Sequence, residues 1–457
     1  MVTKIVVFGM GYVGIPAAAL LADVKGFQVT GVQRRSKRSG WKIDYLNEGK
    51  NPIKGNEPGL EELIHRVVLE KKSFKATDSY DAVKDADYIL VDVQTPTDEK
   101  HVPQYVSLKE VAATVGKLMK KGVTVIIEST CAPGTTNYII KPILEENSGM
   151  KAGTDFHLAF SYERVMVGRL LHNITNYARI VGGLTPKCTE KGIWLYKHIV
   201  KAPLYPTDPL TAEVAKTVEN AYRDVNIAFS NEVAIICESL GVDAYDVREF
   251  VNSLPNDPSN PSANPVRNMH FPGAGVGGHC LPKDTWLLKY GLDKYGRFKF
   301  EPKILVDSRN LNDHMPQHME ELLDEALKEK GIKMKDARVC ILGYAFLEES
   351  DDTRNTPCKP LYNILKGKCR EVAVHDPYVT DEEGIPLTSD LKAALDGKDA
   401  AVIVTSHKEY SILGLDGLKK LLRTKIIVDG RNVFDPEAAA KAGFTYRGVG
   451  RGLIYRK

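Results

Sequence analysis

One short segment places a thiol, an ammonium and a carboxylate directly after a run of glycines. Gly277 and Gly278 precede Cys280, and Lys283 and Asp284 follow it within four residues. Glycine accepts positive φ and lets a ligand approach the backbone closely. A thiolate is a nucleophile that neighbouring charged groups can activate, so this combination could form a covalent catalyst. The alternative is a glycine-rich loop with a buried structural cysteine, because free cysteine most often packs as a small apolar side chain.

The composition narrows the class of protein that could use such a thiol. The 457 residues carry 62 basic and 59 acidic side chains, and the net charge of +3 gives no case for nucleic acid or a membrane as a partner. A chain of this length predicts two or three domains. The seven cysteines are odd in number and form no CxxC pair, which argues against a disulfide framework or a metal site and indicates a reducing, cytoplasmic setting. We expect neither a signal peptide nor a membrane span, since no apolar run approaches about 18 residues.

The N-terminal residues predict a dinucleotide fold. An apolar strand at 4–8 leads into Gly9, Gly11 and Gly14, and a helix rich in alanine and leucine follows through residue 22. Glycines at this spacing permit a tight turn, close approach to a pyrophosphate and close packing of helix on strand. The helix N-terminus then faces the phosphates.

The residues after the second predicted strand, 27–32, leave the choice of dinucleotide open. An NAD site usually has an acidic residue here, whereas this chain has Gln33, Arg34 and further basic residues up to Arg38. The basic cluster could bind the 2′-phosphate of NADP. Alternatively, Gln33 could bond the ribose hydroxyls while Arg34 stacks on the adenine, which favours NAD. A solvated loop is a third interpretation.

Polar residues follow three further predicted strands. We expect these strands at 88–93, 123–127 and 156–160. Thr95 and Pro96 follow the first, Thr130 follows the second, and Glu163 follows the third. Ligands of open α/β sheets bind at the carboxyl ends of strands, so these side chains are candidates for the nicotinamide and substrate side. Ordinary turn chemistry is the competing explanation for the threonines and the proline.

A long helix is predicted over 207–240, and Gly241 ends it. Its apolar residues recur at three- and four-residue spacing, which suggests an inter-domain spine and a dimer interface. They are Ala212, Ala215, Val218, Tyr222, Val225, Phe229, Val233 and Ile236. Lys216 and Asn220 stand four residues apart on one face and could together stabilise a developing oxyanion. A solvent-facing pair is the competing interpretation.

The last third again alternates strands and helices. A helix is expected from about residue 310 to 330, and strands are expected at 337–343, 371–375, 399–405 and 425–428. This part lacks a complete GxGxxG, so it need not hold a dinucleotide. Arg354 and Arg431 lie in loops after strands, where they could hold phosphate or carboxylate groups or simply be surface charges.

These pieces in this order resemble the nucleotide-sugar 6-dehydrogenase family, which includes UDP-glucose and UDP-N-acetylhexosamine dehydrogenases. The matching segments span essentially the whole chain: 9–14, 95–96, 128–130, 163–164, the helix with Lys216 and Asn220, 277–284 and 352–354. The resemblance implies two Rossmann-like, doubly wound α/β domains joined by a long central helix. It divides the chain into an NAD-binding domain at 1–203, a central helical and dimerisation domain with the cysteine loop at 204–315, and a UDP-sugar-binding domain at 316–457.

The resemblance also implies the chemistry, an NAD-linked four-electron oxidation of a sugar C6 hydroxymethyl to a carboxylate. Cys280 would be the nucleophile, and Lys216 and Asn220 would steady the C6 oxygen. Asp284 would orient a water, with Thr130, and Glu163 would act in hydrolysis or proton transfer. The implied cofactor contacts are Gly9, Gly11, Tyr12, Val13, Gly14, Gln33, Arg34, Thr95, Pro96, Thr130, Lys283 and Arg354. The implied substrate contacts are Glu163, Arg164, Lys216, Asn220, Gly277 and Tyr344.

Details of these motifs bear on the substrate. Glu163-Arg164 and the glycines before Cys280 favour a UDP-N-acetylhexosamine, as the manno, galacto or gluco epimer, for glycan or polysaccharide precursors. Tyr162 replaces the proline expected there, and Pro282 with the two residues after it is closer to the UDP-glucose branch. The alternatives are a UDP-glucose 6-dehydrogenase, a two-electron β-hydroxyacid-type dehydrogenase that does not need the thiol, and a dinucleotide-sensing structural protein. We expect a homodimer.

Overall fold

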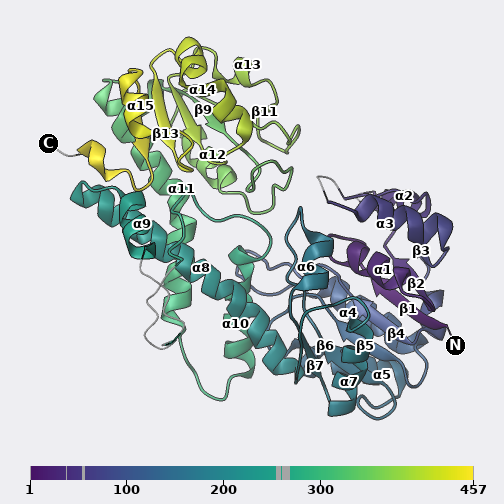
Figure 1. The fold of residues 1–457 in the computed structure, drawn as a ribbon. Coiled ribbons are helices and arrows are strands. Elements are labelled where there is room, and N and C mark those ends of the chain that lie inside the picture. The colour runs from purple at the N-terminus through teal and green to yellow at the C-terminus, as the bar shows by residue number, and fades with distance from the viewer. Residues whose placement is uncertain (1, 38, 54–56, 254–258, 260–267, 456–457) are drawn as a thin grey trace. The chain divides into compact units, whose positions relative to one another are not determined.

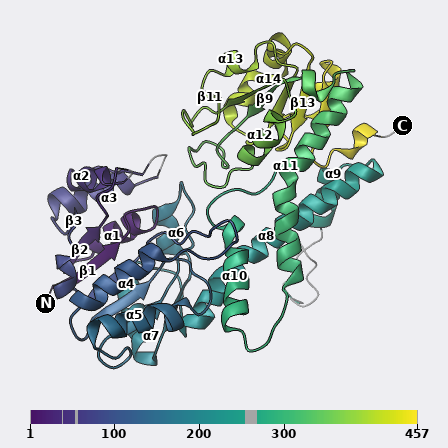
Figure 2. The same cartoon turned by 180° about the vertical axis from the view of Figure 1, so that it is seen from behind.

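The computed structural model describes residues 2–37, 39–53, 57–253, 259 and 268–455. The prediction that concerns Arg38 therefore lies outside the described residues. The chain forms two compact units (Figures 1 and 2). One comprises Met1–Glu219 with Trp286–Glu301, and the other comprises Asn220–Thr285 with Pro302–Lys457.

The first unit is built on an eight-stranded sheet. Its strands are β1 (Thr3–Phe8), β2 (Phe27–Val32), β3 (Phe74–Thr77), β4 (Tyr88–Val91), β5 (Thr124–Ile127), β6 (His157–Phe160), β7 (Arg179–Gly183) and β8 (Leu204–Thr207). They lie in the order β3-β2-β1-β4-β5-β6-β7-β8, and neighbours pair in parallel except β6 with β7. The strand order reverses beside β1, which creates the switch point at which such sheets bind nucleotides.

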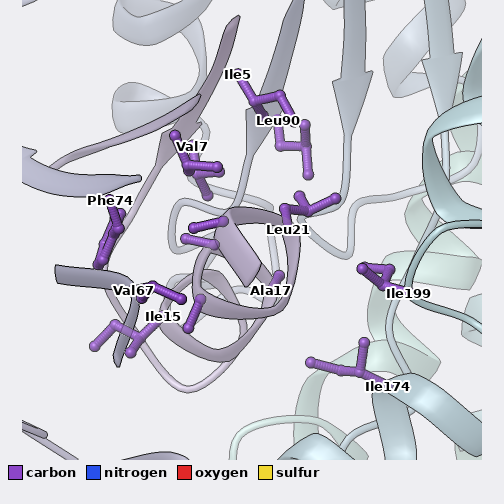
Figure 3. Close-up of a cluster of buried hydrophobic side chains, with 14 of the residues drawn as sticks. Ile5, Val7, Ile15, Ala17, Leu21, Val67, Phe74, Leu90, Ile174 and Ile199 are labelled. Atoms are coloured by element: carbon purple, nitrogen blue, oxygen red, sulfur yellow. The ribbon is translucent and has the colours of Figure 1, made fainter. Parts of the chain in front are cut away.

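Apolar side chains from the sheet and its helices form the core of this unit. Figure 3 shows Ile5, Val7 and Leu90 of the sheet with Ile15 and Leu21 of α1, all almost fully buried. Strands buried on both faces read as continuous apolar runs, which is why the sequence predicts them. The helices of the unit are α1 (Gly14–Asp23), α2 (Trp41–Asn47), α3 (Leu60–His65), η1 (Arg66–Glu70), η2 (Asp81–Asp85), α4 (Val106–Leu118), η3 (Thr136–Ile140), α5 (Lys141–Ser148), α6 (Leu170–Asn176) and α7 (Pro186–Tyr196).

The second unit contains a six-stranded sheet in the order β11-β10-β9-β12-β13-β14, in which all neighbours are parallel. Its strands are β9 (Arg338–Leu342), β10 (Glu371–His375), β11 (Leu387–Thr388), β12 (Ala400–Ile403), β13 (Ile426–Asp429) and β14 (Thr445–Gly448). Its helices are α9 (Ala244–Asn252), α11 (Lys303–Glu329), η5 (Met334–Asp336), α12 (Cys358–Lys366), α13 (Leu391–Leu395), α14 (Lys408–Leu421), α15 (Pro436–Lys441) and η6 (Gly452–Tyr455). The prediction of a second Rossmann-like fold is confirmed.

Helix α11 begins where the sequence gives little local signal. The helix expected from residue 310 is α11, and it begins at Lys303, directly after Pro302. Its first turn has no side-chain cap and no acidic residue, so neither usual start signal marks it. Helix α10 (Leu281–Tyr295) begins immediately after the glycine–cysteine loop.

The long helix α8 (Pro209–Leu240) is confirmed, and the rest of the chain leaves most of its predicted apolar face uncovered. The predicted apolar face is largely exposed: 70% of Tyr222, 57% of Phe229 and 49% of Ile236 is accessible. Of the predicted face Ala212 is buried, and the other buried positions include small and polar side chains: Glu213, Lys216, Thr217, Asp224, Ser230 and Asn231. The three- and four-residue spacing defines a face, but it does not determine whether that face packs within the chain or against another molecule.

Candidate active site

The glycine loop after β1 is shaped by close backbone contacts. A Cβ on Gly9 would lie 2.2 Å from the Asp92 carbonyl oxygen, and Gly9 has φ of +94°. A Cβ on Gly14 would lie 2.0 Å from the Gly9 oxygen. At Gly11, by contrast, nothing lies within 4 Å of the Cβ position, so the backbone is open to a ligand at the start of α1. A pyrophosphate fits this arrangement, since the helix N-terminus favours negative charge.

The residues after β2 are already engaged with other side chains. Gln33 accepts from the Met10 amide at 2.9 Å and donates to Ser39 Oγ at 3.0 Å, which ties it to the glycine loop. Arg34 pairs with Glu110 at 2.5 Å, and both side chains are exposed. A carboxylate at this position would repel a 2′-phosphate, so the pairing favours NAD over NADP.

The loops after β4 and β5 are bonded to each other at the carboxyl edge of the sheet. Thr95 Oγ1 donates to the Thr130 carbonyl at 2.5 Å, and Ser129 Oγ donates to the Val93 carbonyl at 2.7 Å. Thr95 is buried, whereas the adjoining Pro96 is exposed. These contacts place the predicted threonines at the edge where an open α/β sheet binds its ligand.

Lys216 and Glu163 meet within the first unit. Lys216 is only 7% exposed, and its ammonium donates to the Glu163 carbonyl oxygen at 2.9 Å. The ammonium also lies 5.2 Å from the centre of the Tyr162 ring, and Arg164 bonds the Tyr162 hydroxyl at 3.2 Å and Glu219 at 2.8 Å. The solvent-facing interpretation of Lys216 is therefore wrong. Tyr162, which replaces an expected proline, forms one wall of this lysine's environment.

Sequence reasoning missed Arg179, the first residue of β7. Its guanidinium forms ion pairs with both Glu128 and Glu163, and its side chain is only 4% exposed. It also donates to Ser161 Oγ at 2.8 Å and to the Ser161 carbonyl at 2.9 Å. The available signal was an arginine that opens an otherwise apolar strand, because a buried charge requires partners.

The glycine–cysteine loop is held within the second unit by the segment after β9. The Gly278 amide donates to the Arg354 carbonyl at 2.8 Å, and the Asn355 amide group donates to the Gly278 carbonyl at 3.0 Å. Gly278 has φ of +91°, which favours glycine. A Cβ on Gly277 would lie 2.4 Å from the Phe346 Cβ, so the two segments touch where only glycine fits.

Cys280 stands at the start of α10 with its side chain exposed, so the interpretation as a buried structural cysteine is wrong. Its carbonyl accepts from the amides of Lys283 at 3.1 Å and Asp284 at 2.9 Å. The positive end of a helix dipole favours an anion, such as a thiolate, at this position.

Asp284 is fully buried one turn further along α10. Its carboxylate accepts from Asn220 Nδ2 at 2.5 Å and from Lys283 Nζ at 2.7 Å. The structure thus brings together three of the residues implied by the resemblance. The buried ammonium of Lys283 compensates the buried carboxylate, and Asn220 supplies a further hydrogen bond.

His279 lies beside Cys280 but remains uncharged at neutral pH. Burial, assisted by the charges of Lys283 and Arg354, lowers the pKa of His279 to about 4. It therefore cannot serve as an imidazolium partner for a thiolate, as the histidine of a cysteine–histidine pair does.

The last domain contributes residues whose roles differ. Arg354 forms an ion pair with Asp352, and Tyr344 is fully buried, with its amide donating to Asp376 at 2.7 Å. Arg431 donates to the carbonyls of Val404 at 2.7 Å and Gly275 at 3.1 Å. Its guanidinium therefore supports the backbone of the glycine–cysteine loop, which the strand-end position alone did not predict.

The switch point beside β1 and the open glycine loop define a dinucleotide-binding protein. Models of the UDP-glucose/GDP-mannose dehydrogenase family match the chain in three parts: the NAD binding domain at residues 3–200, the central domain at 210–314 and the UDP binding domain at 340–436. The protein belongs to this family of nucleotide-sugar dehydrogenases, and its cofactor is NAD.

Individual relatives align along nearly the whole chain. A UDP-N-acetyl-D-mannosamine dehydrogenase of Pyrococcus horikoshii is 35% identical over 451 residues, which is 99% of this chain and 100% of the relative. A UDP-N-acetyl-D-glucosamine 6-dehydrogenase of Salmonella typhi is 32% identical over 431 residues, 93% of this chain and 95% of the relative.

A solved structure gives a similar result. The crystal structure of an NDP-N-acetyl-D-galactosaminuronic acid dehydrogenase from Methanosarcina mazei superposes with a TM-score of 0.89 and 43% identity, covering 100% of this chain and 97% of that one.

Among the described residues, none of the helices combines the length and apolar character that crossing a bilayer demands.

Proposed function

We propose that the enzyme oxidises the C6 hydroxymethyl of a UDP-N-acetylhexosamine to the uronic acid, with Cys280 as covalent nucleophile. The observation that carries the proposal is the exposed thiol of Cys280 at the N-terminus of α10, one turn before the buried Asp284. Relatives that are 35% and 32% identical bear names of dehydrogenases acting on such sugars, and their substrates differ only in epimer. The product would be a precursor for polysaccharide or glycan synthesis.

The residues of the chain suit the two oxidations. When bound, NAD accepts a hydride from the sugar carbon in each oxidation, so two NAD are reduced for each sugar. After the first oxidation the Cys280 sulfur adds to the aldehyde carbon, and a C–S bond forms in a thiohemiacetal. The second oxidation gives a thioester, and water cleaves its C–S bond to release the carboxylate and the thiol.

Polar side chains of the chain stabilise the charges that develop. Lys216 and Asn220 steady the C6 oxygen as it becomes negative, which a dry site makes most effective. Asp284, with Thr130, orients the hydrolytic water, and Glu163 takes part in hydrolysis or proton transfer. Lys216 and Asp284 are buried, and short hydrogen bonds hold their charged groups in place, which supports these assignments.

The remaining assignments follow the same resemblance. Tyr12, Val13, Gln33 and Pro96 belong to the cofactor site, with Lys283 and Arg354. Arg164, Gly277 and Tyr344 belong to the sugar-nucleotide site. We also propose the three-part division at 203 and 315, and the family models that end at 200 and 314 support it.

We also propose a homodimer that uses the exposed face of α8. Tyr222, Phe229 and Ile236 recur every seven residues on that face and are between 49% and 70% exposed. An apolar seam of this period is typical of helices that pair with one another. A second copy of the chain offers the same seam.

A substrate panel with NADH counted tests the function. UDP-GlcNAc, UDP-ManNAc, UDP-GalNAc and UDP-glucose are each supplied in limiting amount with excess NAD. We expect two NADH per sugar and a uronic acid product for one of the acetamido sugars. One NADH per sugar with a stable aldehyde or keto product would contradict the proposal, and activity on UDP-glucose alone would replace the acetamido assignment.

A further inference from the structure

Glu163 belongs to a cluster of enclosed charged and polar side chains in the first unit. Its members come from the segments that follow β4, β5 and β6, from β7 and from α7. They are Asp92, Glu128, Glu163, Arg179 and Tyr196, and Lys216 on α8 contacts the cluster through the Glu163 carbonyl. The proposed reaction assigns a role only to Glu163 and Lys216, which leaves the rest of the cluster unexplained.

Arg179 is at the centre of this cluster. Its guanidinium bridges the carboxylates of Glu128 and Glu163, and its carbon lies 3.7 Å from the centre of the Tyr196 ring. Two of its nitrogens also bond Ser161, once at the hydroxyl and once at the carbonyl. One side chain therefore fixes both the Glu163 carboxylate and the backbone two residues before it.

The second carboxylate of the bridge has its own neighbour. Asp92 Oδ2 and Glu128 Oε2 are both enclosed, and neither has a hydrogen-bond donor among the described residues. Burial, followed by the charge and hydrogen bond of Glu128, raises the pKa of Asp92 well above its ordinary value. A proton held between these two carboxyl groups satisfies both oxygens and leaves one negative charge on the pair.

The charges then balance in a definite way. Arg179 carries one positive charge and faces two negative groups, Glu128 and Glu163, while protonated Asp92 is neutral. Tyr196 donates to the Glu128 oxygen at 2.6 Å and so stabilises that carboxylate. The two glutamates compete for the single guanidinium, because each is stabilised as an anion by the same positive charge.

We propose that Arg179 is a positioning residue: its ion pair keeps Glu163 ionised and aligned for the dehydrogenase reaction. The ion pair that Arg179 also forms with Glu128 weakens its stabilisation of the Glu163 anion. Arg179 reaches the reaction only through Glu163 and through the Ser161–Glu163 backbone that carries the bond to Lys216. The inference rests on the proposed function for its catalytic consequence, but the ionisation of Glu163 can be measured without turnover.

The experiment follows the ionisation of Glu163 directly in the full-length enzyme. Infrared difference spectra, with the corresponding Glu163→Gln spectra subtracted, report the pH at which its carboxyl gains a proton. In parallel, the pH profile of kcat is recorded with NAD and the UDP-sugar that the enzyme oxidises. Arg179→Met removes the charge, and Arg179→Lys keeps the charge but cannot span both carboxylates and Ser161.

The expected changes have opposite signs in two variants. In Arg179→Met, Glu163 gains its proton about one to three pH units higher, and the acid limb of kcat moves up with it. Arg179→Lys gives a smaller shift in the same direction. In Glu128→Gln the competing carboxylate is removed, so Glu163 holds its charge to lower pH than in the wild type. If Arg179 had only a structural role, the Arg179 and Glu128 variants would not shift the titration of Glu163 in opposite directions.

Asp92→Asn is the matched control, because asparagine has the shape and neutral charge of a protonated aspartate. In this variant both the titration of Glu163 and the pH profile of kcat should stay as in the wild type. If Arg179→Met fails to fold, Arg179→Lys and Glu128→Gln still test the opposite shifts.

An unmoved Glu163 titration in these variants overturns the inference, even where two NADH per sugar are formed. A shifted titration supports it, even in an enzyme that oxidises no UDP-sugar, and in that case only the proposed function is overturned.

Discussion

Replacing Gly277 by alanine should disable the cysteine loop while leaving the glycine loop after β1 intact. The added Cβ would lie 2.4 Å from the Phe346 Cβ and 3.0 Å from the Asn355 carbonyl, whereas ordinary contact begins at 3.4 Å. The two segments must therefore separate by about 1 Å. The Phe346 Cβ is attached to the backbone, so no rotation of the phenylalanine ring can relieve the contact.

The magnitude follows from that displacement. A misplacement of about 1 Å near the reacting groups costs about 100-fold in rate, and overpacking of a buried contact costs about 1–3 kcal/mol of stability. We expect kcat/KM to fall about 100-fold in Gly277→Ala and the urea unfolding midpoint to decrease. The affinity for NAD, measured by protein fluorescence, should fall far less than kcat/KM, because the loop at Gly9–Gly14 belongs to the other unit.

Two controls make this prediction specific. Gly367→Ala adds a methyl group where the nearest atom is 3.7 Å away, and it should leave activity unchanged. Adding Phe346→Ala to Gly277→Ala should restore nothing, because alanine keeps the offending Cβ, whereas adding Phe346→Gly should restore part of the activity. Wild-type kcat/KM and stability in Gly277→Ala would refute the reasoning.

Four further outcomes are expected. Cys280→Ser should form no uronic acid yet bind NAD as the wild type does, and turnover at the wild-type rate would contradict the thioester mechanism. Gln33→Glu should reduce any activity with NADP at least about tenfold relative to NAD, since a carboxylate repels the 2′-phosphate; this is measured as the ratio of kcat/KM values. Burial raises the pKa of Asp224 from 3.8 to about 6, so the folded state binds a proton that the unfolded state releases, and stability falls as pH rises through that window. Arg309→Met leaves this buried carboxylate unpaired and should cost about 3–5 kcal/mol in urea unfolding, more at about pH 8 than at about pH 5; an equal loss at both would argue against an ionised Asp224. Tyr222→Glu should convert the proposed dimer to monomers in analytical ultracentrifugation, and an unchanged mass would place any interface elsewhere.

Local sequence patterns were sufficient to predict the two nucleotide-type folds. Their strands are short apolar runs and the first is followed by Gly9, Gly11 and Gly14, so pattern and steric requirement are local and can be read along the chain. The start of α8 was equally predictable, because Asp208 caps it within three residues. The order of motifs also identified the family to which the chain belongs.

Which side chains are buried together could be read only from the folded chain. Arg179 meets Glu128 across 51 residues, and Asn220 meets Asp284 across 64. No periodicity encodes such pairings, because they depend on how strands and helices pack and not on the spacing within any one of them. The same reason explains α8, whose polar face turned inward with Lys216 while its apolar face stayed exposed: burial follows the partner that a face meets, and the sequence of one helix does not contain that partner.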